Sequence, residues 1–342
     1  MQVVKSSHPV YPQNLHISRH GWVSGILKSG PGHNAGTQES LPEIACDIAP
    51  KELPEDYRLT NYRVVRTLGE GGFGITYQAE DILLQRSVVI KENFISSICY
   101  RQDRTMRVCL NGDENREIYN WALTSFLREA RLLASLDHPN MAKVYSCFQA
   151  NNTAYYVTKF IKGPSLAGLA EDYDVHGMAI PQNALWGVMV QMLDALEYLH
   201  CKGVIHRDIK PDNILITKDG IPVLIDFGAA GEYNGNTDRA GVVQSVGFSP
   251  PEQEKDGKGM GPWTDLYALG ATLYYTLTGQ CLSSGRLREI YDNTPPLTAM
   301  PHLRAQYHPK LLATIQKAIS PKIHDRYLSA AEWLEALRTP EG

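Results

Sequence analysis

Asp208, Lys210 and Asn213 bring three groups that can act on phosphate into one short segment of the chain. A carboxylate can accept the proton of an attacking hydroxyl, an ammonium group can neutralise a moving phosphoryl group, and an amide oxygen can bind Mg²⁺. The apolar residues Val204–Ile205 precede this segment and Ile214–Ile216 follow it, so the polar residues form a loop between buried segments. These residue types and their spacing predict phosphoryl transfer at this loop.

Two further segments could complete such a site. Asp226 follows the apolar run Val223–Ile225, which places a second carboxylate at the end of a buried strand, where it could bind Mg²⁺. The glycine-rich segment from Gly69 to Gly74 lies between two alternating segments, which predicts a strand–turn–strand hairpin. Glycine has no Cβ, so the backbone there can approach phosphate closely. A glycine segment alone would often be only a turn, and its context is what favours phosphate binding.

This ordered set of motifs resembles the protein kinase family over about residues 57–337. The resemblance implies an α+β fold of two lobes, a small β-rich lobe with one main helix and a larger helical lobe. It implies ATP and Mg²⁺ as cofactors, with Mn²⁺ as an alternative metal. Asp208, Lys210 and Asn213 would be catalytic, and Asn213 and Asp226 would bind the metal. Lys210 is typical of members that phosphorylate serine and threonine.

The resemblance also implies a catalytic pair of Lys91 and Glu129. Lys91 ends the β-branched run Val88–Ile90, 22 residues after Gly69, and in the family such a lysine holds the α- and β-phosphates. Glu129 lies in the segment 126–136, whose apolar residues have helical spacing. The alternatives are a solvated lysine at the end of a strand and a surface glutamate that pairs with arginine.

The same resemblance implies which residues surround the nucleotide. The glycine segment would cover the phosphates, and two strands and the segment that joins the lobes would enclose the adenine. Thr76 and Val89 stand where the family usually has valine and alanine, and Thr158 would lie at the back of the pocket. The implied contacts are Gly69, Gly71, Gly72, Phe73, Gly74, Thr76, Val89, Lys91, Thr158, Lys159, Ile161 and Leu215.

The segment after Asp226 resembles the activation segment of the family. Ser245 would bridge the catalytic carboxylate and lysine, and Thr237 is a candidate phosphorylation site, with an ordinary solvated threonine as the alternative. Glu252 and Arg326 are implied to form a buried structural ion pair. Asp265 is implied to accept hydrogen bonds from the backbone of the catalytic loop, and it would also suit the N-terminus of the helix it opens.

Composition and periodicity divide the chain into three parts. Residues 1–56 are rich in Ser, Gly, Pro and His, residues 57–160 are predicted to form the β-rich lobe, and residues 161–339 the helical lobe. An insertion at about 93–121 separates Lys91 from Glu129. In the N-terminal extension, Trp22 and nearby aliphatic residues favour docking on a lobe or on a partner, and a flexible tail is the alternative.

The composition of the whole chain limits its partners and its location. The 342 residues are 43% hydrophobic, enough for a packed core in two lobes, and the net charge of −4 gives no reason to expect nucleic acid as a partner. No run of 18 apolar residues occurs, so we expect no membrane span. The six cysteines are predicted to be free thiols, and Cys99 and Cys109 to flank a hairpin. We expect a cytoplasmic protein, with secretion into a host cell as the alternative.

Two other functions stay open at this stage. One is a pseudokinase-type scaffold that binds partners without catalysis. The other is an enzyme of the same fold that acts on a non-protein substrate. The charged residues that catalysis needs in the family are all present, which argues against a scaffold without catalysis. The Pro250-Pro251-Glu252 segment argues against a non-protein substrate. The protein substrates cannot be identified from the sequence.

Overall fold

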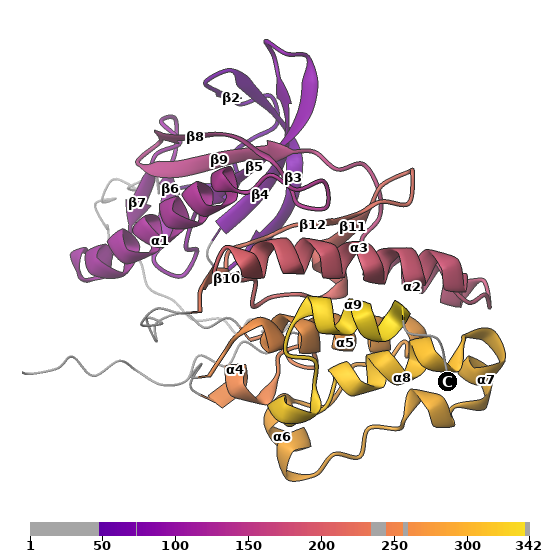
Figure 1. The fold of residues 1–342 in the computed structure, drawn as a ribbon. Coiled ribbons are helices and arrows are strands. Elements are labelled where there is room, and N and C mark those ends of the chain that lie inside the picture. The colour runs from indigo at the N-terminus through magenta and orange to yellow at the C-terminus, as the bar shows by residue number, and fades with distance from the viewer. Residues whose placement is uncertain (1–47, 73, 234–243, 256–258, 339–342) are drawn as a thin grey trace, which may run out of the picture. The chain divides into compact units, whose positions relative to one another are not determined.

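Alternating apolar residues build the main sheet of the N-terminal lobe. The computed structural model describes residues 48–72, 74–233, 244–255 and 259–338, and Figure 1 shows a β-rich lobe joined to a mainly helical one. In the central strand β4 (Gly74–Asp81) every second side chain is buried, which is the pattern of a strand with one face on a core. All strands of this sheet pair antiparallel, in the order β2-β3-β4-β5-β9-β8. Their bounds are β2 (Arg58–Leu59), β3 (Tyr62–Gly71), β4 (Gly74–Asp81), β5 (Arg86–Asn93), β8 (Val144–Ala150) and β9 (Thr153–Lys159).

The predicted insertion supplies two of the three strands of a second, smaller sheet. The three strands have the order β1-β6-β7, with β1 at Ile48–Ala49, β6 at Cys99–Gln102 and β7 at Val108–Leu110. The hairpin expected around Cys99 and Cys109 is therefore present, and both cysteines are free thiols. Strand β1 pairs with β6, so the described chain enters the N-terminal lobe along the insertion.

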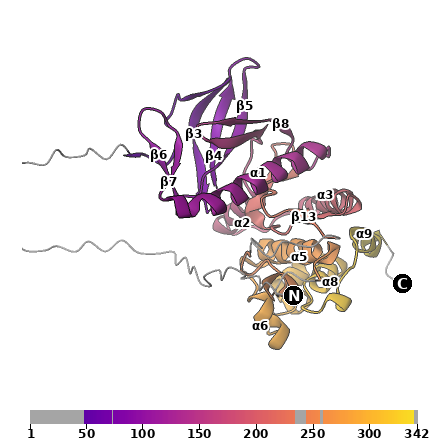
Figure 2. The same cartoon turned by 90° about the vertical axis from the view of Figure 1, so that its left-hand side faces the viewer.

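The main helix of this lobe, α1, spans Arg116–Ser135. The sequence indicated helical spacing over residues 126–136 and assigned about 93–121 to the insertion, but α1 already begins at Arg116, within that insertion. The buried residues of α1 begin at Tyr119 and continue at helical spacing through Ala122 and Phe126, so the apolar stripe extends into the segment assigned to the insertion. Helix α1 packs on β5, β8 and β9 (Figure 2).

The C-terminal lobe is organised around α5 (Pro262–Thr278), most of whose residues are buried. The helices are α2 (Leu166–Val175), α3 (Gln182–Cys201), α4 (Pro251–Lys255), α6 (Gly285–Ile290), α7 (Pro301–Gln306), α8 (Pro309–Ala318) and α9 (Ala330–Arg338). The short strands are β10 (Val204–Ile205), β11 (Ile214–Ile216), β12 (Pro222–Leu224) and β13 (Gly231–Glu232), paired β10 with β13 and β11 with β12.

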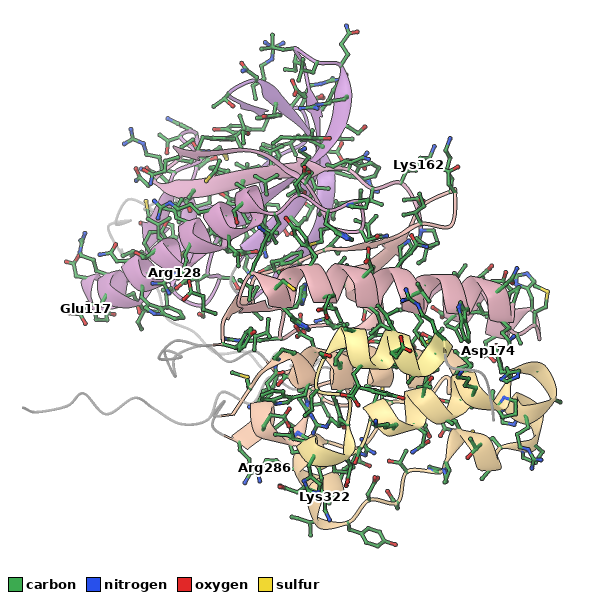
Figure 3. All side chains as sticks on the ribbon, viewed as in Figure 1. Glu117, Arg128, Lys162, Asp174, Arg286 and Lys322 are labelled. Atoms are coloured by element: carbon green, nitrogen blue, oxygen red, sulfur yellow. The ribbon has the colours of Figure 1, made fainter. Side chains whose placement is uncertain are left out.

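Charged side chains at the edges of both lobes point away from the ribbon, as Lys162 does on the segment that joins the lobes (Figure 3).

Among the described residues, no helix is both long and apolar enough to cross a lipid bilayer. The predicted role of Trp22 and the candidate phosphorylation site Thr237 lie outside the described residues, as does Phe73 of the glycine segment.

A buried ion pair joins α4 to the segment before α9. Arg326 donates from Nη1 to Oε1 of Glu252 at 2.7 Å and from Nη2 to Oε2 at 3.1 Å. Both residues are buried, at 2% and 8% exposure. Arg326 also binds the carbonyl oxygens of Ser320 and Pro321, so one guanidinium group fixes two segments.

We predict that Arg326→Met lowers the free energy of unfolding by about 3–5 kcal/mol, because it leaves the Glu252 carboxylate buried without its cation. Urea unfolding followed by near-ultraviolet circular dichroism measures this. Lys255→Ala is the matched control, because Lys255 pairs with Glu289 at an exposed site and its loss should change stability by about 0–1 kcal/mol. Equal losses in the two variants would contradict the structural role of the buried pair.

Candidate active site

Lys91 lies at the centre of an ionic cluster built from three parts of the chain. Its Nζ is 3.2 Å from Oε1 of Glu129 on α1 and 2.6 Å from Oδ1 of Asp226, in the loop after β12. The Lys91 and Glu129 side chains are mostly buried, at 19% and 9% exposure, whereas Asp226 is 46% exposed because it faces an open cavity. The structure therefore brings together three residues that the sequence predicted from separate motifs.

Tyr156 completes this cluster, and the sequence analysis missed it. Its hydroxyl donates to Oε1 of Glu129 at 2.7 Å, the same oxygen that Lys91 contacts. Tyr156 lies on β9 two residues before Thr158, so both side chains are on the same face of the strand. That spacing was the available signal, because a strand that supplies the back of the nucleotide pocket must also present the residue two positions earlier.

The cluster fixes the charges of its members. Burial lowers the pKa of Lys91, but Tyr156, Glu129 and Asp226 act in the other direction and hold it well above its usual value. Burial raises the pKa of Asp226, yet the charge and the hydrogen bond of Lys91 outweigh this and lower it to about 2. At neutral pH the site therefore holds an ammonium group beside an ionised carboxylate, a pairing suited to phosphate and a divalent cation.

The catalytic-loop residues form a second cluster on the C-terminal lobe. Ser245 donates to Oδ1 of Asp208 at 2.6 Å, and Lys210 Nζ lies 2.9 Å from Oδ2 of Asp208. Lys210 also lies 3.4 Å from the Ser245 hydroxyl. Asn213 donates from its amide nitrogen to the backbone oxygen of Asp208 at 2.8 Å and to Oδ2 at 2.9 Å. Asp208 is thus held by three side chains, and the predicted bridge through Ser245 is present in the structure.

Asp265 holds the backbone of the catalytic loop in place. At the start of α5 it accepts the backbone N–H groups of His206 at 2.8 Å and Arg207 at 2.9 Å, and Nε2 of His200 lies 2.9 Å from it. Burial raises the pKa of Asp265, but the hydrogen bond and charge of His200 lower it below its usual value. The His200 contact was not predicted, because nothing in the sequence of α3 distinguishes this histidine from an ordinary helix terminus.

Two residues of the site have a left-handed backbone conformation, which residues other than glycine rarely adopt. Arg207 has a φ of 67° and Asp226 a φ of 59°. Such conformations cost about 1–3 kcal/mol and persist where the surroundings fix them. The conformation of Arg207 is held by the hydrogen bond from its backbone N–H to Asp265. Next to Asp226, the backbone N–H of Ile225 donates to the carbonyl oxygen of Asn213 at 2.9 Å. This bond holds the chain before Asp226 against Asn213, the other predicted metal ligand.

A cavity of about 450 Å³ connects the two clusters. It is lined by the glycine segment, by Thr76, by the Lys91 cluster and by Asp208 and Lys210. A Cβ at Gly69 or Gly72 would meet nothing within 4 Å, so these glycines face open space. A Cβ at Gly228 would lie 3.2 Å from Lys91 Nζ and would crowd the ion pair. The cavity suits polyphosphate, since it has glycine backbone on one side and a cation at its base.

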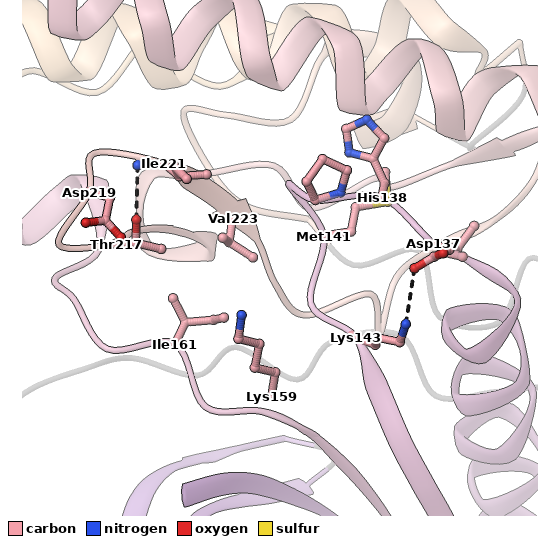
Figure 4. A pocket seen from close by; sticks show the side chains of 12 residues that line it. Asp137, His138, Met141, Lys143, Lys159, Ile161, Thr217, Asp219, Ile221 and Val223 are labelled. Carbon is pink, nitrogen blue, oxygen red and sulfur yellow. Dashed lines mark hydrogen bonds and ion pairs between the residues drawn. The ribbon is translucent and has the colours of Figure 1, made fainter. Parts of the chain in front are cut away.

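The remaining predicted nucleotide contacts lie away from this cavity. Val89 and Thr158 are paired neighbours on β5 and β9, and Thr158 is 8% exposed. Leu215 lies on β11 opposite Val223. Lys159 and Ile161 line a second cavity of about 480 Å³, and Figure 4 shows their side chains there. Their contact with adenine would therefore be through the backbone.

The donor set fits a hard divalent cation. Asp226 offers a carboxylate, and because the amide nitrogen of Asn213 is used by Asp208, the amide oxygen of Asn213 remains as the ligand. One carboxylate and one amide oxygen from the protein, together with phosphate oxygens of a nucleotide, would suffice for a small divalent cation that keeps several waters.

Comparison with known proteins agrees with this geometry. A family model described as the protein kinase domain matches residues 62–327. The serine/threonine-protein kinase PknA of Nostoc is 34% identical over 290 residues, which cover 81% of this chain and 47% of PknA. The kinase PrkC of Bacillus subtilis is 33% identical over 242 residues, which cover 68% of this chain and 34% of PrkC. A solved structure described as "PpkA-294 apo form" has a TM-score of 0.74 and 34% identity, and the match covers 84% of this chain and 100% of that one.

The two-lobed fold and the geometry of the site thus agree with the family model, and the chain belongs to the protein kinase family. The predicted fold class and the predicted family are both confirmed. The chain spans about half the length of PknA and of kinase D from Synechocystis, which it also matches.

We predict that Tyr156→Phe lowers kcat/KM for ATP by about tenfold or more, since it removes the hydrogen bond to Oε1 of Glu129 that helps to hold this side chain beside Lys91. Steady-state kinetics with varied ATP measures this. Tyr145→Phe on the neighbouring strand β8 is the control, because the Tyr145 ring packs under Arg86 and is remote from Glu129. The same kinetics in both variants would show that Tyr156 is only a packing residue.

We predict that Thr158→Met weakens the binding of bulky aryl inhibitors of the adenine pocket, because the longer side chain fills the space behind the adenine. Calorimetric titration of one such inhibitor into both proteins measures the change. Val65→Met, an exposed site on β3, controls for an added methionine and should bind like wild type. Unchanged affinity in Thr158→Met would place this residue outside the pocket.

Proposed function

We propose that this protein transfers the γ-phosphoryl group of ATP to serine and threonine hydroxyls of proteins, its own chain included. The observation that carries the proposal is the set of contacts around Asp208, where Ser245 and Lys210 bind separate oxygens of one carboxylate. This carboxylate lines the same cavity as Lys91 and Asp226. A hydroxyl acceptor and a phosphoryl donor would therefore meet between the two clusters.

Each cluster has its own task in this proposal. Asp208 would orient the attacking hydroxyl and accept its proton, and Lys210 would stabilise charge on the transferring group. The Ser245 hydroxyl already occupies one oxygen of Asp208 at 2.6 Å, in the position that a substrate hydroxyl would share. Lys91, held by Glu129, would orient the α- and β-phosphates. Catalysis would then consist mainly of positioning and electrostatic stabilisation.

Asp226 and Asn213 would hold Mg²⁺, which supplies charge neutralisation on the phosphates when it is bound. In the present structure Lys91 contacts Asp226 directly at 2.6 Å. Binding of the metal at Asp226 would replace part of that contact and free the Lys91 ammonium for phosphate.

The substrate class rests on Lys210 and on the relatives. PknA, PrkC and kinase D are named as serine/threonine-protein kinases, and their matches cover 81%, 68% and 82% of this chain, respectively. The five cysteines within the described residues are free thiols, which supports the cytoplasmic location that the sequence predicts. We propose no specific protein substrate.

We predict that Asp208→Ala lowers turnover by about 10²-fold or more, the scale of a lost acid–base group, and leaves nucleotide affinity nearly unchanged. Asp226→Ala should instead weaken the binding of Mg-ATP, because it removes a metal ligand. Transfer of labelled phosphate to a general substrate protein measures turnover, and a fluorescent nucleotide measures affinity with and without Mg²⁺.

Two results would contradict the proposal. Wild-type turnover in Asp208→Ala would remove the assigned mechanism. Absence of any transfer by the wild-type protein, with intact Mg-ATP binding, would favour the scaffold alternative. Phosphosite mapping after incubation with Mg-ATP identifies the residues modified.

A further inference from the structure

Glu92, the residue after Lys91, lies at the centre of a second charged cluster inside the N-terminal lobe. Neighbouring residues of a strand point to opposite faces, so Lys91 faces the cavity and Glu92 faces the lobe interior. The Glu92 side chain is fully buried, at 0% exposure. A carboxylate at such a position needs several partners, because desolvation of an unpaired charge is very unfavourable.

Three side chains supply those partners, each from a different strand. Tyr77 on β4 donates to Oε2 at 2.7 Å, and Tyr155 on β9 donates to Oε1 at 2.6 Å. Arg101 on β6 donates from Nη2 to Oε2 at 2.8 Å, and its side chain is also 0% exposed. The two sheet neighbours of β5 and the insertion are therefore all tied to the residue beside Lys91.

Arg101 uses its other donors on the backbone. Its Nε donates to the carbonyl oxygen of Lys51 at 2.7 Å, and its Nη1 donates to that of Met106 at 3.0 Å. The guanidinium group also lies 5.1 Å from the centre of the Phe94 ring. Arg101 thereby connects the segment that enters the lobe, the turn of the inserted hairpin and the strand that carries Lys91.

Stability alone does not account for this arrangement. Apolar side chains of similar volume usually serve a protein interior as well as a buried ion pair does, or better, because the pair loses its hydration. What an ion pair with four further hydrogen-bonded partners adds is a fixed geometry. The strand held by this geometry is the one whose ammonium group must be placed accurately for phosphoryl transfer.

We propose that Arg101 is a positioning residue for Lys91, which acts through Glu92 and makes the inserted hairpin part of the nucleotide site. The proposal rests on the role proposed above for Lys91. It gives the insertion a task that its sequence does not reveal, since Arg101 lies on the opposite side of the sheet from the cavity.

The test compares full-length variants. Arg101→Met removes the tie and leaves Glu92 unpaired. Glu92→Gln with Arg101→Met removes both charges. The amide oxygen can accept from one of Tyr77 and Tyr155, and the amide N–H can donate to the hydroxyl oxygen of the other, so the double variant should restore much of the stability without the tie. Arg101→Lys keeps the charge but has fewer donors in a different geometry. Each protein is examined for its melting temperature, for ATP KM and kcat, and for acylation of Lys91 by an acyl phosphate of ATP, mapped by mass spectrometry.

Two controls match these variants. Arg288→Met removes a guanidinium group that is equally buried, at 1% exposure, but lies in the C-terminal lobe against Tyr267 and Asp292. Arg63→Ala removes an exposed contact with Asp56 at 3.1 Å in the N-terminal lobe, outside the glycine segment. Both controls should leave ATP KM and Lys91 acylation at wild-type values per folded molecule.

We expect Arg101→Met and the double variant to lower kcat/KM for ATP by about 10- to 100-fold, the scale of a small misplacement of a catalytic group, and to lower Lys91 acylation in parallel. Arg101→Lys should be intermediate. The double variant is decisive, because recovery of stability without recovery of ATP KM separates positioning from folding.

Two other outcomes have distinct meanings. If the double variant recovers both stability and ATP KM, or if Arg101→Met changes only the melting temperature as Arg288→Met does, the inference is overturned. If Lys91→Met itself keeps wild-type turnover, the proposed role of Lys91 fails first. Should Arg101→Met not fold, the double variant and Arg101→Lys still decide between these outcomes.

Discussion

The contact on which the rest of the site depends is that of the Lys91 ammonium with the Glu129 and Asp226 carboxylates. Its three members come from β5, α1 and the loop after β12, which lie up to 135 residues apart. No local segment can make this contact, so the sheet, the helix and the C-terminal lobe must be placed together before it forms. The contact is partly buried, where charges interact more strongly than in water, so the loss of one partner would leave another charge poorly compensated. Tyr156 adds a hydrogen bond that holds Glu129 in position.

In the C-terminal lobe, buried charged side chains likewise hold loops together that are distant in the sequence. Asp265 holds the backbone of His206 and Arg207, and the Glu252–Arg326 pair fixes the end of the activation segment. Buried charges of this kind contribute less to stability than their short distances suggest, because they have lost their hydration. Their effect is to select one arrangement of the loops, and the left-handed backbone of Arg207 shows that the selected arrangement is locally unfavourable.

Sequence reasoning predicted the fold class and the family because the kinase motifs are short, local and fixed in order. It reached the members of the Lys91 cluster by register, one motif at a time. It missed Tyr156, His200 and the pair of Glu92 and Arg101, since each is recognisable only through a partner distant in the chain. The early start of α1 was missed for a different reason. Turn signals in the insertion outweighed an apolar stripe that begins at Tyr119.

Strand β9 shows how one constraint links the two clusters of the N-terminal lobe. Tyr155 and Tyr156 are consecutive, so they point to opposite faces, and their hydroxyls bind Glu92 at 2.6 Å and Glu129 at 2.7 Å. Across the sheet, β9 pairs Tyr156 with Lys91 and Tyr155 with Glu92. A slip of one residue between β5 and β9 would exchange the faces and break both sets of contacts at once. The register of these two strands is therefore set by two carboxylates, one in the cavity and one in the core, and whatever holds Glu92 in place also holds Lys91.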